Sequence, residues 1–126
     1  MISIDDFKKL EIKIGHILSV EKVLGTDKLL KLSVDFGLKS TNDSTDHSME
    51  QNGLDERDIR QIVSGISEYF PDIQVLVGKK CAFATNLEPR LIRGFESQGM
   101  ILAVSGESFF SLLETTNNVV PGSSVK

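Results

Sequence analysis

Five short runs of apolar and β-branched residues, separated by polar or turn-forming segments, restrict this chain to a fold built from short strands. The runs cover residues 12–23, 30–36, 59–66, 80–86 and 99–104. In the second run apolar and polar residues alternate, and the apolar positions are Leu30, Leu32, Val34 and Phe36. This period of two is typical of a strand with one buried face. The pattern therefore predicts an all-β chain and excludes a helical bundle.

Two interruptions of this pattern indicate how the strands are arranged. Gly15 stands inside the first run, where a glycine often marks a bulge or a sharp bend. Between the third and fourth runs, Ser67 is predicted to cap one helical turn, which Pro71 ends. Five strands, one of them bent, with a short helical connection after the third, predict a five-stranded OB-fold Greek-key barrel. Small SH3-like barrels and half-sandwiches have similar numbers of strands and remain alternatives.

Both ends of the chain extend beyond the predicted barrel. Ser3 and the two aspartates that follow it predict a short N-terminal helix. Residues 105–126 form a C-terminal extension that includes Phe109 and Phe110. Its apolar side chains must pack on something, which is either the barrel or a second subunit. Residues 1–126 are predicted to form a single domain, because this length suits one hydrophobic core.

The net charge of −4 is confined to one polar segment, residues 39–58. This segment holds two basic and six acidic residues, so the remainder is balanced, with 12 of each. It has almost no large apolar side chains and cannot bury enough surface to offset its ordering entropy. We therefore expect an acidic flexible insert between the second and third strands. The acidity of the whole chain does not exclude an anionic partner, because the barrel itself is neutral.

The residue types that carry chemistry in enzymes and metal sites are sparse. Cys81 is the only cysteine, which excludes an internal disulfide and favours a reducing, cytoplasmic setting. We expect Cys81 to be a buried small side chain and His16 a structural histidine, while His47 lies in the polar segment. No nucleophile elbow, phosphate-binding loop or metal-ligand cluster is present, so the predicted catalytic residues, cofactors and metal sites are none. The sequence also lacks a signal-peptide pattern and an apolar run of about 20 residues, so no membrane partner is expected.

The segment from Asn86 to Met100 is the strongest candidate for a functional site. It joins the predicted fourth and fifth strands, and in an OB barrel this loop lies over the ligand-binding face. Arg90 and Arg93 can each grip a phosphate with two hydrogen bonds or stack on an unpaired base. Met100 offers apolar surface to a base, and Asn86 and Ser97 offer hydrogen bonds. These properties favour a nucleic-acid partner.

Several segments also match the motifs of a known family. They read DKLLKLSVDFG at 27–37, RQIVSGI at 60–66, VGKK at 77–80, NLEPRLIRGFESQGM at 86–100 and VVPGSSVK at 119–126. In these segments the chain resembles the tRNA-binding domain family. That family occurs as a free-standing bacterial tRNA-binding protein and as the C-terminal module of many bacterial methionyl-tRNA synthetases. The resemblance covers most of the chain outside residues 39–58 and implies an OB fold.

The resemblance implies a tRNA-binding role for nine residues that match the family motif. They are Lys28, Lys31, Arg60, Ser64, Asn86, Arg90, Arg93, Ser97 and Met100. The chain also departs from the family pattern. Leu91 stands where a basic residue is usual, Glu88 where lysine is common, and residues 23–26 lack a frequent His-Pro pair. These departures make the arginine loop less positive and imply modest, salt-sensitive binding.

The function implied by the resemblance is a non-catalytic module that binds tRNA by its shape and backbone. It would act in trans or as an appendage of a methionyl-tRNA synthetase, whose catalytic chain would then be a partner. Homodimerisation is expected from the C-terminal extension and from family precedent. The alternative is a peptide-binding secretion chaperone, because one branch of the same fold family has that role.

Overall fold

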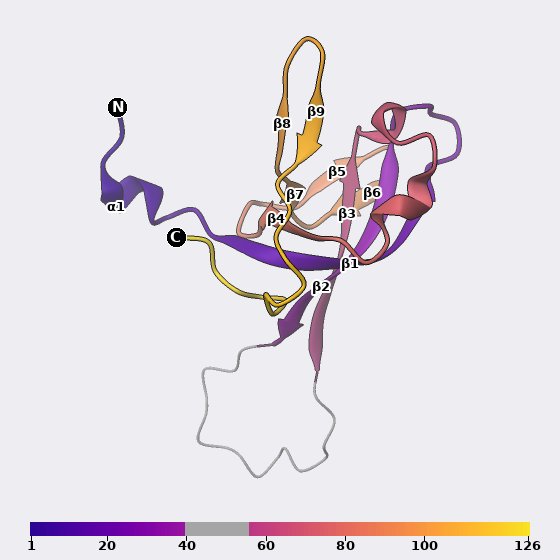
Figure 1. Ribbon diagram of the computed structural model, residues 1–126. Coiled ribbons are helices and arrows are strands. Elements are labelled where there is room, and N and C mark those ends of the chain that lie inside the picture. Colours follow the sequence, from indigo (N-terminus) through magenta and orange to yellow (C-terminus); the bar gives the residue numbers. More distant parts are fainter. Residues whose placement is uncertain (40–55) are drawn as a thin grey trace.

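The predicted strands form one curled sheet in the computed structural model, which describes residues 1–39 and 56–126 (Figure 1). Within these residues, five strands follow the order β3-β2-β1-β4-β7, and β5-β6 and β8-β9 form separate hairpins. The helical elements are α1 (Ile4–Phe7), η2 (Ser67–Tyr69) and η3 (Ile73–Leu76). The strands are β1 (Ile12–Lys22), β2 (Leu30–Leu38), β3 (Arg57–Ser64), β4 (Lys80–Ala84), β5 (Arg90–Ile92), β6 (Phe95–Ser97), β7 (Met100–Ile101), β8 (Ala103–Ser105) and β9 (Phe110–Leu112). The protein is an all-β, OB-like half-barrel, as predicted.

The long strand β1 is central to the sheet because it pairs antiparallel with both β2 and β4. Its predicted bulge lies elsewhere than expected: the pairing register with β2 shifts between Ile17 and Ser19, not at Gly15. Gly15 is instead a point of close packing, since a β-carbon there would lie 2.5 Å from Val34 and 2.6 Å from Phe36. The absence of a side chain therefore lets β2 side chains cross directly over β1.

The interior of the curled sheet is filled by the apolar face that the alternation predicts. The positions Leu30, Leu32, Val34 and Phe36 are all buried. Phe36 meets Phe83 of β4 edge to face, with ring centroids 5.2 Å apart. Leu76 of η3 is fully buried and belongs to the same core cluster. One continuous core thus joins the strands of the sheet and η3 among the described residues.

Cys81 lies in this core with no exposed surface, as expected for a small buried side chain. Burial raises the pKa of its thiol to about 12, and the nearby carboxylate of Glu114 adds to the rise. The thiol is therefore protonated and sterically inaccessible at neutral pH, which removes both conditions for a reactive cysteine.

Three segments differ from the sequence prediction. Ser67 lies inside η2 and makes no cap hydrogen bond, whereas Asp72 caps η3 by accepting from the Gln74 N–H at 3.1 Å. The predicted fifth strand, 99–104, is divided between β7 and β8 at Leu102. The end of the predicted insert is wrong too, because Arg57 and Asp58 belong to β3. The rest of that insert, residues 40–55, lies outside the described residues.

The C-terminal segment packs on the barrel of its own chain. After β9, the N–H of Ala82 donates to Leu113 O at 2.9 Å. Further on, Gly122 and Val125 donate to the carbonyls of Ile14 and Ile12, at 2.7 and 2.9 Å. The segment therefore runs beside β4 and then β1 and satisfies the edge of β1 that the sheet leaves open. The extension therefore packs on the barrel, which was one of the two alternatives. Several of its apolar side chains nevertheless stay exposed.

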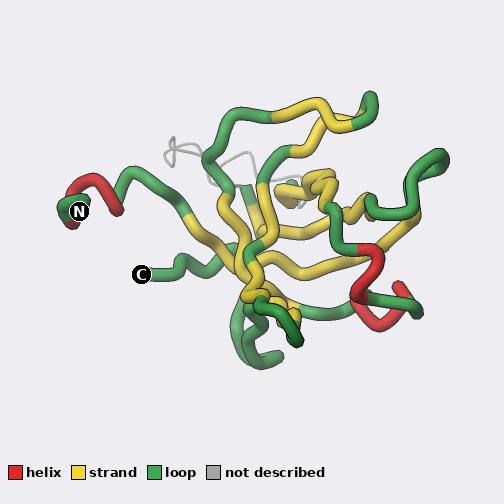
Figure 2. The backbone as a smooth tube through the Cα atoms, turned by 90° about the horizontal axis from the view of Figure 1, so that it is seen from above, coloured by secondary structure: helices red, strands yellow, loops and turns green. Residues whose placement is uncertain are grey.

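The N-terminal helix α1 forms as predicted but does not pack on the sheet. Ser3 caps it in a reciprocal capping box with Asp6. None of its residues is buried, and it stands apart from the barrel in both views (Figures 1 and 2). The C-terminus ends on the same side of the molecule.

The backbone contact between β2 and the C-terminal segment predicts a sharp difference between two glycines. Gly122 has a φ of +93°, and a β-carbon there would overlap the carbonyl oxygen of Phe36. Gly25 has a similar φ of +86° but open space around it. Gly25→Ala should lower the free energy of unfolding by about 1–2 kcal/mol, the cost of a left-handed alanine. Gly122→Ala should lower the free energy of unfolding clearly more, as measured by urea unfolding. If the two variants lose the same free energy, the C-terminal segment does not pack tightly on β2.

The burial of Cys81 predicts that its thiol reacts only after unfolding. A disulfide thiol reagent should label the folded protein no faster than it unfolds, and should label it at once in denaturant. Because the pKa is higher in the folded state than the usual value of about 8.5, the unfolded state binds fewer protons above that pH. The free energy of unfolding should therefore fall as the pH rises from about 9 to about 12. It should fall less steeply in the Cys81→Ala variant. Rapid labelling of the folded protein at neutral pH would contradict this account.

Candidate nucleic-acid interface

In the structure, the predicted arginine loop is a β-hairpin with a two-residue turn. Strands β5 and β6 pair through Ile92 and Phe95, and Arg93 and Gly94 form the turn between them. Both turn residues have positive φ, 54° and 86°, as a type I′ turn requires. Arg93 is exposed at the tip, and Arg90 is exposed at the open end of the hairpin. The two arginines predicted to bind phosphate thus lie exposed on one short hairpin.

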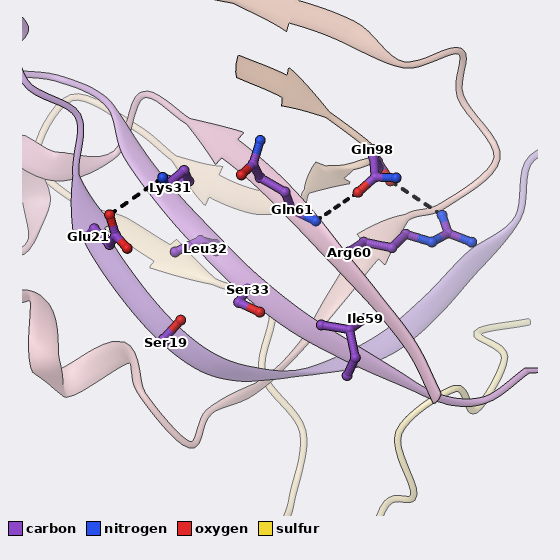
Figure 3. A pocket seen from close by; sticks show the side chains of 9 residues that line it. All are labelled: Ser19, Glu21, Lys31, Leu32, Ser33, Ile59, Arg60, Gln61 and Gln98. Atoms are coloured by element: carbon purple, nitrogen blue, oxygen red, sulfur yellow. Dashed lines mark hydrogen bonds and ion pairs between the residues drawn. The ribbon is translucent and has the colours of Figure 1, made fainter. Parts of the chain in front are cut away.

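A polar groove of about 380 Å³ lies next to this hairpin, on the outer face of β1, β2 and β3 (Figure 3). Its lining residues are Ser19, Glu21, Lys31, Leu32, Ser33, Ile59, Arg60, Gln61 and Gln98. Most of these side chains can donate or accept hydrogen bonds, and this is the face on which OB folds bind ligands. The groove is open and shallow, which suits an extended backbone better than an enclosed small molecule.

Arg60 is held by the protein itself. Its guanidinium pairs with Asp58 at 3.0 Å and donates to the carbonyl oxygens of Thr85, at 2.6 Å, and Gln98, at 3.3 Å. The side chain is only 22% exposed and its charged end lies 5.3 Å from the ring of Phe36. Arg60 therefore joins β3 to the chain on either side of the hairpin, and its role in the groove is chiefly to shape the wall.

The two lysines predicted for the site lie at different depths. Lys28 is exposed in the turn between β1 and β2. Lys31 is half-buried, with its ammonium 3.5 Å from the Glu21 carboxylate and 4.6 Å from the centre of the Phe95 ring. Lys31 thus connects the groove on the sheet to the β5-β6 hairpin.

Two of the predicted polar residues, Asn86 and Ser97, hold the frame together, and Ser64 lies at the end of β3. The side-chain amide of Asn86 accepts from the Glu11 N–H and donates to Lys9 O, both at 2.7 Å. Ser97 is 4% exposed, and its hydroxyl accepts from the Val63 N–H at 2.9 Å. Ser64 is half-buried opposite Leu30 at the end of β3.

Met100 is the remaining predicted residue, and its side chain is exposed on β7. It follows Gly99, whose φ of +150° turns the chain from the hairpin into the last strand of the sheet. Met100 therefore offers the apolar surface that the sequence suggested, at the base of the hairpin and not in the groove lining.

Of the nine residues that line the groove, sequence reasoning singled out only Lys31 and Arg60 as site residues, and two of those that it missed are glutamines bonded to each other. The side-chain oxygen of Gln98 accepts from the Gln61 N–H at 3.0 Å, and the Gln98 N–H donates to Gln61 O at 2.8 Å. The Gln61 amide also donates to Glu96 O at 2.9 Å. Gln98 stands inside the motif string that carries the family resemblance, which was the available signal. Gln61 stands in the string at 60–66, which carries the same resemblance, but its place in a strand pattern otherwise indicates only the outer face.

The described residues hold no group of three histidine, cysteine or acidic side chains that could bind a metal ion. His16 lies half-buried on β1, opposite Asp35 and Lys80 in the two pairing registers. In the same ranges, no helix is long and apolar enough to cross a membrane.

Comparisons with known proteins agree with the geometry of the groove and hairpin. The family model described as "Putative tRNA binding domain" matches residues 49–124, more than half of the chain. The methionine–tRNA ligase of Lactiplantibacillus plantarum is 37% identical over 122 residues, which cover 97% of this chain and 15% of the ligase. That of Methanoregula boonei is 42% identical over 127 residues, which cover 100% of this chain and 16% of the ligase. The chain therefore spans about one sixth of the length of these relatives.

Solved structures give the same result for the fold. The MetRS related protein from Pyrococcus horikoshii superposes with a TM-score of 0.79 and 33% identity, covering 100% of this chain and 98% of that one. The CsaA chaperone protein from Picrophilus torridus superposes with a TM-score of 0.75 and complete coverage of both chains, but with 24% identity. The chaperone likeness shows a common fold alone. By the family match and by its likeness to the Pyrococcus protein, this chain belongs to the tRNA-binding domain family.

Proposed function

We propose that this protein is a non-catalytic module that binds tRNA by its shape and backbone, using the β5-β6 hairpin and the adjoining groove. The observation that carries the proposal is the placement of Arg90 and Arg93. Ion pairs among the described residues engage neither guanidinium, and both side chains are exposed beside the ligand face of the barrel. Two uncommitted arginines on one rigid hairpin can each take a phosphate oxygen pair.

In this proposal the nine predicted residues divide into two groups. Arg90, Arg93, Lys28 and Lys31 contact the phosphates, with Met100 close to the sugars and bases. Arg60, Asn86 and Ser97 act through the shape of the surface, because their polar groups bond within the protein, and the half-buried Ser64 lies beside them at the end of β3. The amides and hydroxyls of the groove supply neutral hydrogen bonds, which suit 2′-hydroxyl groups.

The relatives suggest the setting in which such a module works. They are methionine–tRNA ligases, of which this chain resembles only a part. We infer that the aminoacylation chemistry belongs to a separate catalytic part, to which this module delivers tRNA in the cytoplasm. The delivery is either in trans or within one longer protein.

We also propose that the module works as a homodimer joined through its terminal segments. Ile4, Phe7 and Leu10 expose apolar surface that, together with Val125, lines a groove of about 420 Å³. A four-residue helix is far too short to be stable alone, so α1 needs a packing partner. A second copy supplies the same apolar face and makes the contact two-fold symmetric.

The proposed phosphate contacts predict a change in both affinity and salt dependence. Arg90→Ala/Arg93→Ala should weaken tRNA binding at low salt by tenfold or more, since each charged hydrogen bond contributes about 1.5–3 kcal/mol. Loss of two phosphate contacts should also reduce the slope of log K against log salt by about 1.4–1.8. Fluorescence anisotropy with a labelled tRNA transcript, at about 50–200 mM salt, measures both quantities.

The matched control is Lys9→Ala/Lys39→Ala, which removes two exposed lysines in weak ion pairs away from the hairpin. This control variant should leave the slope of log K against log salt nearly unchanged. If both double variants lose the same affinity and slope, binding reflects net charge and not this site. If the unmodified protein fails to bind tRNA at low salt but binds an unfolded peptide, the chaperone alternative replaces the proposal.

The proposed dimer predicts a selective effect of charge at α1. Phe7→Glu places a carboxylate in the apolar groove and should convert the dimer to a monomer in sedimentation equilibrium. Val104→Glu changes a similarly exposed residue on the β8-β9 hairpin and should leave the dimer intact. If the unmodified protein is a monomer in sedimentation equilibrium even at high concentration, the proposed dimer is wrong.

A further inference from the structure

A second cavity, of about 290 Å³, lies where the turn between β1 and β2 meets the β5-β6 hairpin. It is lined by Glu21, Lys22, Val23, Leu24, Lys31 and Phe95. Two of these residues, Glu21 and Lys31, also line the polar groove, where Figure 3 shows them side by side. The cavity therefore adjoins that groove. Arg93 lies two residues before Phe95 on the same hairpin.

One side of this cavity is apolar and open to solvent. Leu24 is 96% exposed, although it follows the buried residue Val23. Phe95 is half-buried, its backbone pairs with Ile92 across the hairpin, and the Lys31 ammonium lies over its ring. Leu24 and the Phe95 ring thus supply the apolar part of the cavity lining.

The other side of the cavity carries a charge pair that can rearrange. The Lys31 ammonium is 4.6 Å from the centre of the Phe95 ring, in a cation–π contact, and 3.5 Å from the Glu21 carboxylate. Contacts of this kind at partly exposed sites are weak, so a ligand can displace the ammonium from the ring. A displaced Lys31 remains within the groove, where a phosphate is its natural partner. Glu21 is then free to accept hydrogen bonds from a ligand N–H.

These three features fit one chemical group. A nucleobase has a flat face for the Phe95 ring, amino or imino donors for a carboxylate, and a phosphate at a fixed distance for a lysine. An apolar peptide side chain would use Leu24 and Phe95 but would make no hydrogen bond with Lys31 or Glu21, which would stay paired with each other. The mixture of aromatic, acidic and basic groups therefore favours a nucleotide over a peptide.

We propose that this cavity receives one unpaired nucleobase of the bound tRNA, stacked on Phe95 with its amino edge on Glu21, while Lys31 pairs with the adjoining phosphate. The inference rests on the proposed function, since it deepens the same interface from backbone contact to capture of a base. Stacking is tolerant of base identity, so the site adds affinity for a tRNA that presents an unpaired base without reading an anticodon.

The central test separates the ring from the charges. Phe95→Leu keeps an apolar side chain but removes the aromatic face, and should weaken tRNA binding by about five- to one-hundredfold. Because no charge is lost, the slope of log K against log salt should stay the same, unlike that of the arginine variant. Phe95→Tyr keeps the ring and should keep the affinity. Leu91→Ala, on the outer side of the same hairpin opposite Glu96, is the matched control and should bind normally.

A second measurement tests the base directly. Cytidine and guanosine 5′-monophosphates differ from ribose 5-phosphate only by the base. In NMR titrations the two nucleotides should shift the ring signals of Phe95 and the side-chain signals of Lys31 and Glu21. Ribose 5-phosphate should leave the Phe95 ring signals unmoved.

The outcomes distinguish this inference from the proposed function. Equal tRNA affinity of the Phe95→Leu variant and the unmodified protein, with the arginine variant still impaired, overturns the base site alone. So does a Phe95 shift that ribose 5-phosphate reproduces, or one caused only by an apolar peptide. Failure of the unmodified protein to bind tRNA overturns the proposed function itself.

Discussion

The placement of the candidate site depends on how β3 is joined to the hairpin, because the sheet itself does not pair these strands. The buried Ser97 hydroxyl accepts from the Val63 N–H, and the Gln98 N–H donates to Gln61 O. Arg60 adds hydrogen bonds from β3 to the carbonyls of Thr85 and Gln98. A buried hydrogen bond of this kind contributes about 1 kcal/mol, but losing one partner leaves the other unsatisfied and costs more. These bonds curl the half-barrel and fix the hairpin over the groove.

Ion pairs within the sheet explain how a protein with an acidic balance keeps a face suited to phosphate. Acidic side chains of the described sheet are paired: Asp58 with Arg60, Asp35 with Arg57 at 2.8 Å, and Glu21 with Lys31. Each pair neutralises a carboxylate near the strands, and the arginines of the hairpin are not used in this way. At physiological salt a charge acts over about 8 Å. The ion pairs near a bound phosphate therefore affect it more than the net charge of the whole chain does.

Sequence reasoning succeeded where one local pattern decides the structure and failed where distant contacts decide it. The alternation in β2 predicted the core face, and Ser3 predicted α1 correctly, because both follow from neighbours in the chain. The role of Gly15 depends on Val34 and Phe36, which lie on the next strand. The partners of Arg60 could not be predicted either, since a motif does not reveal the carbonyls of Thr85 and Gln98 that it meets. The β5-β6 hairpin was read as a loop because its strands are only three residues long.

The backbone at the hairpin tip supports a functional role for its arginine by a separate argument. Arg93 has a φ of 54°, a left-handed conformation that glycine, asparagine or aspartate adopts more readily in a type I′ turn. For other residues the conformation costs about 1–2 kcal/mol. Gly94, the next residue, already supplies one glycine to the turn, and Arg93 is exposed and fills no part of the core. A strained arginine that adds nothing to packing is best explained by what its side chain contacts in a complex.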